Sequence, residues 1–210
     1  MAADEQALIE IFTSVKYNLD IIYRELLNLD YVFKSEINYN FEKPLSNPLP
    51  DVEILLNELD IIVKPFGYVP ESLKYFYRIV GSCNFAWDMK KNDEPFRTYA
   101  DPLQVCALDD LVSYMRNGDW LEIMTEEGMA YIELSADYYH KDDTSGGMPY
   151  SIAITPEPSI DSSFLYEEHD TTFINYLRIS MENCGFSRIT KEKNDYQKFF
   201  DKVKPQLKQI

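Results

Sequence analysis

The chain has 210 residues, of which 45% are apolar and 27% charged, a composition that excludes disordered, fibrous and membrane proteins. Its three cysteines, Cys83, Cys106 and Cys184, are odd in number and lack Cys-x-x-Cys spacing, so we predict neither a disulfide framework nor a zinc ribbon. No basic segment with a following apolar run opens the sequence, and no stretch resembles a membrane span. These features predict a protein of the reducing cytoplasm.

The formal net charge of -16 is concentrated in one third of the chain. Residues 101–170 hold 16 Asp and Glu but only Arg116 and Lys141, whereas residues 171–210 are mildly basic. Nucleic acids and anionic membranes are bound mainly through Lys and Arg, so the charge argues against both as partners. It favours a basic protein partner, and we expect the acidic third to form one negative face.

Three helices are predicted in the first 81 residues. Apolar residues recur at intervals of three and four over 8–26, which is the pattern of an amphipathic helix. Three prolines indicate a loop over 38–50, after which helical periodicity resumes over 54–62. A third helix is predicted over 70–81, because its first residue is proline and its last is glycine.

The rest of the chain mixes short strands with helices. Aromatic or β-branched runs bounded by turn residues predict strands at 84–88, 103–107, 121–124, 130–135 and 150–155. Helices are predicted at 109–116, from a cap at Thr171 or Thr172 to Gly185, and at 191–207. The predicted fold class is α+β, a mainly antiparallel sheet flanked by helices in a single domain.

Several stretches of the sequence resemble the SUKH superfamily, which contains fungal cell-wall regulators and many bacterial immunity proteins. They are VPESLKYFYRIVG at 69–81, YADPL at 99–103, SGGMPY at 145–150, FINYLR at 173–178 and CGF at 184–186. Their order and spacing are similar to those of a bacterial subgroup, although many relatives have a second Gly or Asn-Gly where this chain has Gly81-Ser82. The resemblance implies an α+β domain that binds protein partners without catalysis, in bacteria often a toxin's nuclease or other effector domain.

The resemblance covers residues 50–187 and divides the chain into three parts. We expect residues 1–48 to form an N-terminal helix with its connecting loop and residues 49–190 to form the SUKH-like α+β domain. Residues 191–210 are expected to form a basic C-terminal helix that packs on the same domain.

Aromatic residues interleaved with acids are the predicted partner-binding surface, because Tyr and Trp anchor interfaces and carboxylates attract a basic partner. The predicted contact residues are Trp87, Asp88, Asp137, Tyr138, Tyr139, Asp142, Asp143, Glu167 and Glu168. Asp142 and Asp143 precede a glycine turn, so we expect both to be exposed and to tolerate reversal to Lys. The competing interpretation is that Trp87 and Tyr138 belong to the core and that the charges only keep the protein soluble.

Both histidines, His140 and His169, have acidic neighbours in the sequence. Imidazole and carboxylate groups can hold zinc or iron, and a histidine beside a carboxylate can act as a general base. No His-Glu-x-x-His, Gly-x-Ser-x-Gly or paired Cys/His motif accompanies them. We therefore predict no catalytic residue, no metal and no cofactor, and retain a metal-dependent hydrolase using His140 and His169 as an alternative.

Charge and resemblance together predict a non-enzymatic, cytoplasmic immunity protein. Its acidic surface would occlude the basic cleft of a toxin domain such as a nuclease. The main alternative is an intracellular regulatory scaffold of the fungal SUKH type. The sequence leaves the oligomeric state open.

Overall fold

The computed structural model describes residues 2–34, 44–88, 100–118, 120–121, 130–188 and 194–210. The fold is α+β, as predicted, with two small antiparallel sheets in place of one. The first sheet has the order β1 (Leu45–Ser46), β2 (Ser82–Asn84), β3 (Gln104–Val105). The second has the order β4 (Tyr131–Ser135), β5 (Tyr150–Ala153), β6 (Phe164–Leu165). A hydrogen bond of 2.9 Å from Cys106 N to Leu134 O joins the two sheets.

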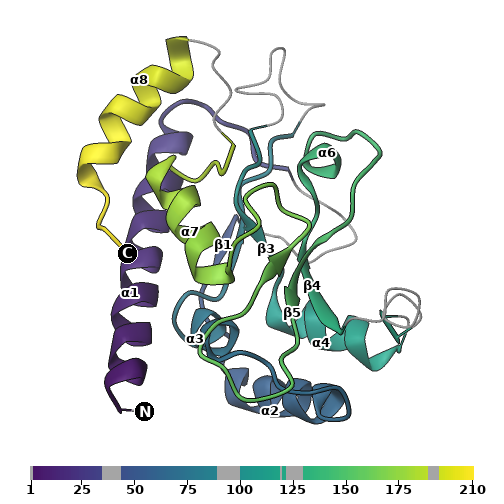
Figure 1. The fold of residues 1–210 in the computed structure, drawn as a ribbon. Coiled ribbons are helices and arrows are strands. Elements are labelled where there is room, and N and C mark those ends of the chain that lie inside the picture. The colour runs from purple at the N-terminus through teal and green to yellow at the C-terminus, as the bar shows by residue number, and fades with distance from the viewer. Residues whose placement is uncertain (1, 35–43, 89–99, 119, 122–129, 189–193) are drawn as a thin grey trace.

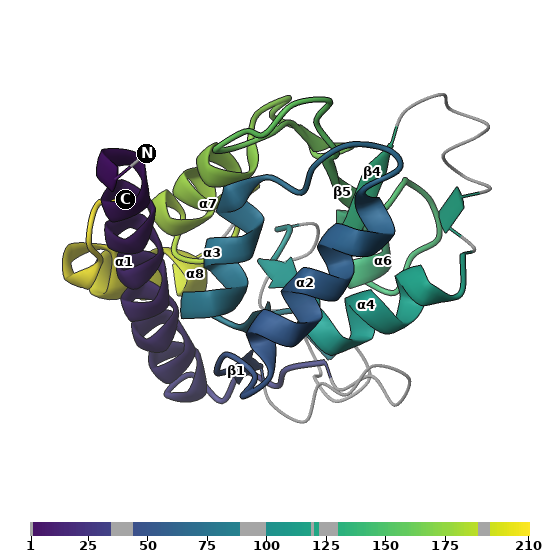
Figure 2. The same ribbon diagram turned by 90° about the horizontal axis from the view of Figure 1, so that it is seen from below.

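Helices surround the sheets on several sides (Figure 1). On one side are α1 (Ala2–Leu27), α7 (Phe173–Glu182) and α8 (Asn194–Val203), and far from them is the short α6 (Tyr138–Lys141). Figure 2 shows α1, α3 (Glu71–Ile79), α2 (Val52–Val63) and α4 (Leu108–Arg116) side by side in that order. No helix in the described part of the chain is long and apolar enough to cross a membrane.

The predicted apolar stripe of α1 is confirmed as core. Its fully buried members are Leu8, Phe12, Val15, Leu19, Ile22 and Leu26. Phe12 packs edge-on against Phe76 of α3 with ring centroids 6.2 Å apart, and Phe76 packs against Phe173 of α7 at 5.7 Å. The three helices therefore share one core, and burying their aromatic rings is the main favourable term in holding them together.

Several predicted boundaries are wrong for local reasons. The strand predicted at 84–88 overlaps β2 only at Asn84, although Phe85 N still donates to Leu103 O at 2.9 Å. The Asn84 side-chain carbonyl then accepts a hydrogen bond from Ala86 N at 3.0 Å, a local bond that is typical of a turn. Thr172 occupies the N-cap position of α7 without a side-chain capping bond, and Asp161 instead accepts from Ile174 N at 3.1 Å.

The C-terminal helix is shorter than predicted. It is α8 followed by the 3₁₀ turn η1 (Lys204–Gln206), where Pro205 cannot continue the α-helical hydrogen bonds. Residues 191–193 of the predicted helix, and residues 122–124 of the strand predicted at 121–124, lie outside the described residues.

Candidate functional site

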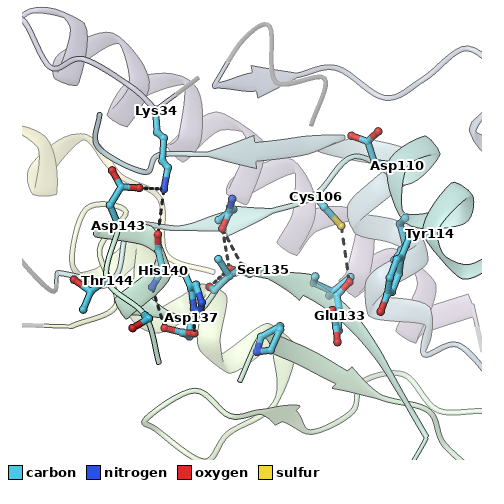
Figure 3. Close-up of a pocket in the computed structure, with 16 residues that line it drawn as sticks. Lys34, Cys106, Asp110, Tyr114, Glu133, Ser135, Asp137, His140, Asp143 and Thr144 are labelled. Carbon is cyan, nitrogen blue, oxygen red and sulfur yellow. Dashed lines mark hydrogen bonds and ion pairs between the residues drawn. The ribbon is translucent and has the colours of Figure 1, made fainter. Parts of the chain in front are cut away.

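A cavity of about 640 Å³ lies where α4, the β3–β4 junction and the loop around α6 meet. This volume is within the range of about 300–1,000 Å³ that is typical of ligand sites. Figure 3 shows Asp110, Tyr114, Cys106 and Glu133 toward one end, which we call the acidic end. Toward the other end, the loop end, lie Lys34, Asp137, His140, Asp143 and Thr144.

The acidic end is built by α4 and β4. Asp110 and Tyr114 are four residues apart in α4, so both project from one helix face. Glu133 stands at the centre of β4, where alternation directs its side chain away from that of buried Ile132. Helix and strand thus bring carboxylates from two separate elements to one hollow.

The side chains of Asp110 and Glu133 are unpaired within the described part of the chain. Asp110 Oδ2 is buried without a hydrogen bond, and neither Asp110 nor Glu133 forms a side-chain hydrogen bond or ion pair with any other residue that the structure describes. Desolvation raises the pKa of both carboxyls, and the charge of Asp109 raises that of Asp110 further. Removing water from a carboxylate without supplying a hydrogen-bond donor lowers the stability of the folded chain.

Cys106 lies between these two carboxylates in Figure 3. Burial raises the pKa of the thiol to about 12, and the charges of Asp110 and Glu133 contribute to the increase. Since the thiolate is the reactive form, Cys106 contributes an uncharged and unreactive thiol to the cavity lining.

The carboxylates of the loop end are satisfied by neighbours. Lys34 Nζ lies 2.7 Å from Asp143 Oδ1 and donates to the carbonyl of His140 at 3.1 Å. Asp137 caps α6, since its Oδ1 accepts from Tyr139 N at 2.7 Å and from His140 N at 3.1 Å. His140 Nδ1 lies 2.5 Å from Asp137 Oδ2. The unsatisfied negative charge is therefore confined to the acidic end.

A buried ion pair anchors α6 beneath this loop. Lys141 Nζ lies 2.5 Å from Asp101 Oδ1, with the two side chains 0% and 1% exposed. The hydroxyl groups of Ser187 and Tyr176 donate to Asp101 Oδ2, and Lys141 Nζ lies 4.6 Å from the centroid of the Tyr150 ring. These contacts fix the short helix from which His140 lines the cavity.

Five of the nine predicted contact residues are buried, namely Trp87, Asp88, Asp137, Asp142 and Glu167. The expected exposure is therefore wrong for Asp142, whereas Asp143 is exposed as expected. Trp87 packs edge-on against Tyr31 with ring centroids 4.5 Å apart. Glu167 accepts from His169 N at 2.8 Å and from Thr171 N at 2.9 Å, which holds a turn. Because Asp142 is buried, the paired reversal of Asp142 and Asp143 would also disturb the fold.

The other four predicted residues are accessible, but they do not form one surface patch with the cavity. Asp143 lines the cavity, whereas Tyr138, Tyr139 and Glu168 do not. Arg188 stacks over the Tyr138 ring at 4.0 Å, and its Nε lies 2.6 Å from Glu168 Oε2. These three residues are therefore engaged within the chain, away from the unsatisfied carboxylates.

The two histidines serve separate loops. His140 pairs with Asp137, while His169 Nε2 lies 3.1 Å from the carbonyl oxygen of Ser187. Among the described residues, no group of three or more His, Cys, Asp or Glu side chains is arranged to hold a metal. The geometry gives no specific observation in favour of a hydrolase that uses His140 and His169.

Sequence reasoning missed the acidic end of the cavity, which is formed by Cys106, Asp110, Tyr114 and Glu133. A signal was present, because Asp110 and Tyr114 have helical spacing and Glu133 interrupts an otherwise apolar strand.

Comparison of the chain with protein-family models, with curated proteins and with solved structures finds no match. The site must therefore be interpreted from its own chemistry.

Proposed function

We propose that this chain is a non-enzymatic, cytoplasmic binding protein of the SUKH type that neutralises a basic toxin domain. The observation that carries the proposal is the cavity, which is lined by Glu133 and by Asp110, whose Oδ2 is buried without a hydrogen bond in the described part of the chain. A carboxyl whose pKa is raised by folding binds more protons in the folded chain, so its ionised form at neutral pH lowers stability. An unpaired charged side chain that lowers stability is expected at a binding surface, where the bound protein supplies the opposite charge.

Charge and sequence support the same class of partner. Four carboxylates line the cavity, those of Asp110, Glu133, Asp137 and Asp143. Its described lining contains one lysine, Lys34, and no arginine. The sequence resemblance to bacterial SUKH immunity proteins supports a toxin as the type of partner. A nuclease toxin carries a basic cleft that binds phosphates, and occluding that cleft needs no catalysis by the inhibitor.

The test is co-expression of this chain with the toxin domain encoded beside its gene. We expect the two to co-purify, and the association rate constant to fall by about tenfold or more between low and physiological salt, because screening shortens electrostatic steering. Failure to form a complex would contradict the proposed function. A rate constant that does not change with salt would contradict the electrostatic mechanism.

A further inference from the structure

The outward face of α2 carries the two most exposed large apolar side chains that the structure describes. Ile54 is 69% exposed and Ile61 is 66% exposed. Because they are two helical turns apart, they lie on one face of α2, about 10 Å from each other along its axis. Figure 2 shows α2 between α3 and α4 on the outside of the molecule. We call this face the isoleucine ridge, and aligned apolar side chains of this kind are typical of a surface that another protein covers.

The flanks of the isoleucine ridge are charged, but their charges balance. Each carboxylate of α2 forms an ion pair with a cation from a neighbouring helix. The pairs are Glu53–Arg78 and Asp60–Lys74, with cations from α3, and Glu58–Arg116, with its cation from α4. An apolar centre with a polar rim is the usual anatomy of a protein interface. Because the charges balance, this face is not complementary to a strongly basic or a strongly acidic protein.

The two ends of α2 carry opposite charges. Asp51 occupies the N-cap position without a side-chain capping bond, and Lys64 occupies the C-cap position, where its Nζ lies 4.5 Å from the centroid of the Tyr68 ring. Both Asp51 and Lys64 are exposed. They lie equally far from the midpoint of the helix, and so do Ile54 and Ile61. Turning α2 end over end about that midpoint therefore exchanges the two isoleucines and brings each charge to the level of its opposite.

We propose that a second copy of this chain covers the isoleucine ridge, with the two α2 helices packed antiparallel about a two-fold axis. Ile54 of each copy then packs on Ile61 of the other. A two-fold interface must be complementary to itself, and the order of residues along α2 meets this condition. Parallel packing would place like charges and like helix dipoles at the same end, whereas antiparallel packing places Asp51 of one copy near the level of Lys64 of the other.

The proposed dimer is compatible with the rest of the molecule. A stable dimer buries about 800 Å² per copy, so the flanking surfaces of α3 and α4 take part beside α2. At physiological salt, screening over about 8 Å limits the repulsion between the acidic remainders of the two chains. No residue of α2 lines the cavity, so the dimer leaves the proposed toxin site open.

Sedimentation equilibrium over a series of protein concentrations tests the dimer. We expect the wild type to approach twice the mass of one chain as its concentration rises toward about 0.5 mM. Ile54→Glu places a carboxylate against an apolar side chain twice in each dimer, so it should raise the dimer dissociation constant at least about tenfold. The control Leu27→Glu changes a 48% exposed leucine at the end of α1 that lies far from α2 (Figure 1), and should leave that constant unchanged. A wild type with the mass of one chain at every concentration, or equal effects of the two substitutions, would overturn the proposal.

A charge exchange tests the antiparallel orientation. Ile61→Lys alone should weaken the dimer as Ile54→Glu does. In Ile54→Glu/Ile61→Lys, antiparallel packing brings each new carboxylate to a new ammonium group, so the dimer should be at least about threefold tighter than that of either single variant. Parallel packing would bring like charges together. A double variant that dimerises no better than the single variants would therefore refute antiparallel packing.

Folding of the variants and the proposed function are both separable from this outcome. Circular dichroism checks the fold, and Ile54→Ala decides the question if Ile54→Glu does not fold, because alanine favours the helix and still removes apolar surface. Ile54→Glu should bind the toxin domain as the wild type does. Toxin binding by a chain that never dimerises would refute the dimer alone, whereas a dimer without a toxin partner would refute the proposed function alone.

Discussion

Replacing Lys141 by methionine is expected to destabilise the folded chain by about 3–5 kcal/mol, since breaking a buried ion pair leaves the other charge uncompensated. Asp101 would keep two hydroxyl donors, from Ser187 and Tyr176, but no cation. Urea unfolding followed by circular dichroism measures the loss. Because Lys141 ends α6, the loop that lines the cavity should loosen as well.

A second lysine in this chain provides the matched control. Lys202 Nζ lies 2.5 Å from Glu25 Oε2, the same distance as in the buried pair, but the Lys202 side chain is 59% exposed while that of Glu25 is 8% exposed. We expect Lys202→Met to cost less than about 1 kcal/mol, since water solvates the Lys202 ammonium and Glu25 keeps Asn28 and Arg24 as partners. Equal losses for Lys141→Met and Lys202→Met would show that burial is not what makes the first pair important.

A double-mutant cycle separates the pair from its surroundings. Asp101 has a φ of 53°, in the left-handed region that asparagine also tolerates, so Asp101→Asn removes the charge without new backbone strain. The variant Asp101→Asn/Lys141→Met should be less destabilised than the sum of the single changes by about 1–3 kcal/mol. Strict additivity would contradict a direct interaction between the two charges.

Gly147→Ala is expected to destabilise the chain by about 2–3 kcal/mol, combining left-handed backbone strain with damage to the cap of α6. Gly147 has a φ of 78°, and a Cβ placed there would lie 2.6 Å from the Asp137 side-chain carbon Cγ. The methyl group would displace the carboxylate that holds the N-terminus of α6. Urea unfolding at neutral pH measures the cost.

Gly118 supplies the control for this substitution. It has the same φ of 78°, but the nearest atom to its added Cβ is Leu121 Cδ1 at 4.0 Å. Gly118→Ala should therefore lower the free energy of unfolding only through left-handed backbone strain, by about 1 kcal/mol. If Gly147→Ala costs no more than Gly118→Ala, the contact with Asp137 is not structurally important.

The sequence was sufficient to predict the fold class and most helices, because these depend on periodic burial. The stripe from Leu8 to Leu26 follows directly from apolar spacing, and the helix predicted at 109–116 is α4 with one further residue at its start. The two-residue strands β1 and β6 have no such period, and their pairing is set by distant partners such as Cys83 and Ser151. The division of strands into two sheets depends on these long-range contacts, which local patterns do not encode.

The site was only partly predictable for a related reason. An acidic residue looks the same in sequence whether it caps a helix, pairs with a buried lysine or stands unsatisfied in a cavity. Asp137, Asp101 and Asp110 have these three fates, and only tertiary packing distinguishes them. Aromatic neighbours drew attention to residues 137–143, whereas the proposed site uses Asp110 and Glu133, which form no side-chain hydrogen bond or ion pair with another described residue.

The affinity of the co-purified toxin domain for cavity variants tests the central claim most directly. We expect the dissociation constant of the complex to rise by about thirtyfold or more for Asp110→Asn/Glu133→Gln, because truncating a buried interfacial charge pair costs several kcal/mol. The control Asp20→Asn/Glu157→Gln, which removes the same charge from two exposed positions, should bind as the wild type does. An unchanged dissociation constant in the cavity variant, or an equal increase in both variants, would contradict binding through the acidic end of this cavity.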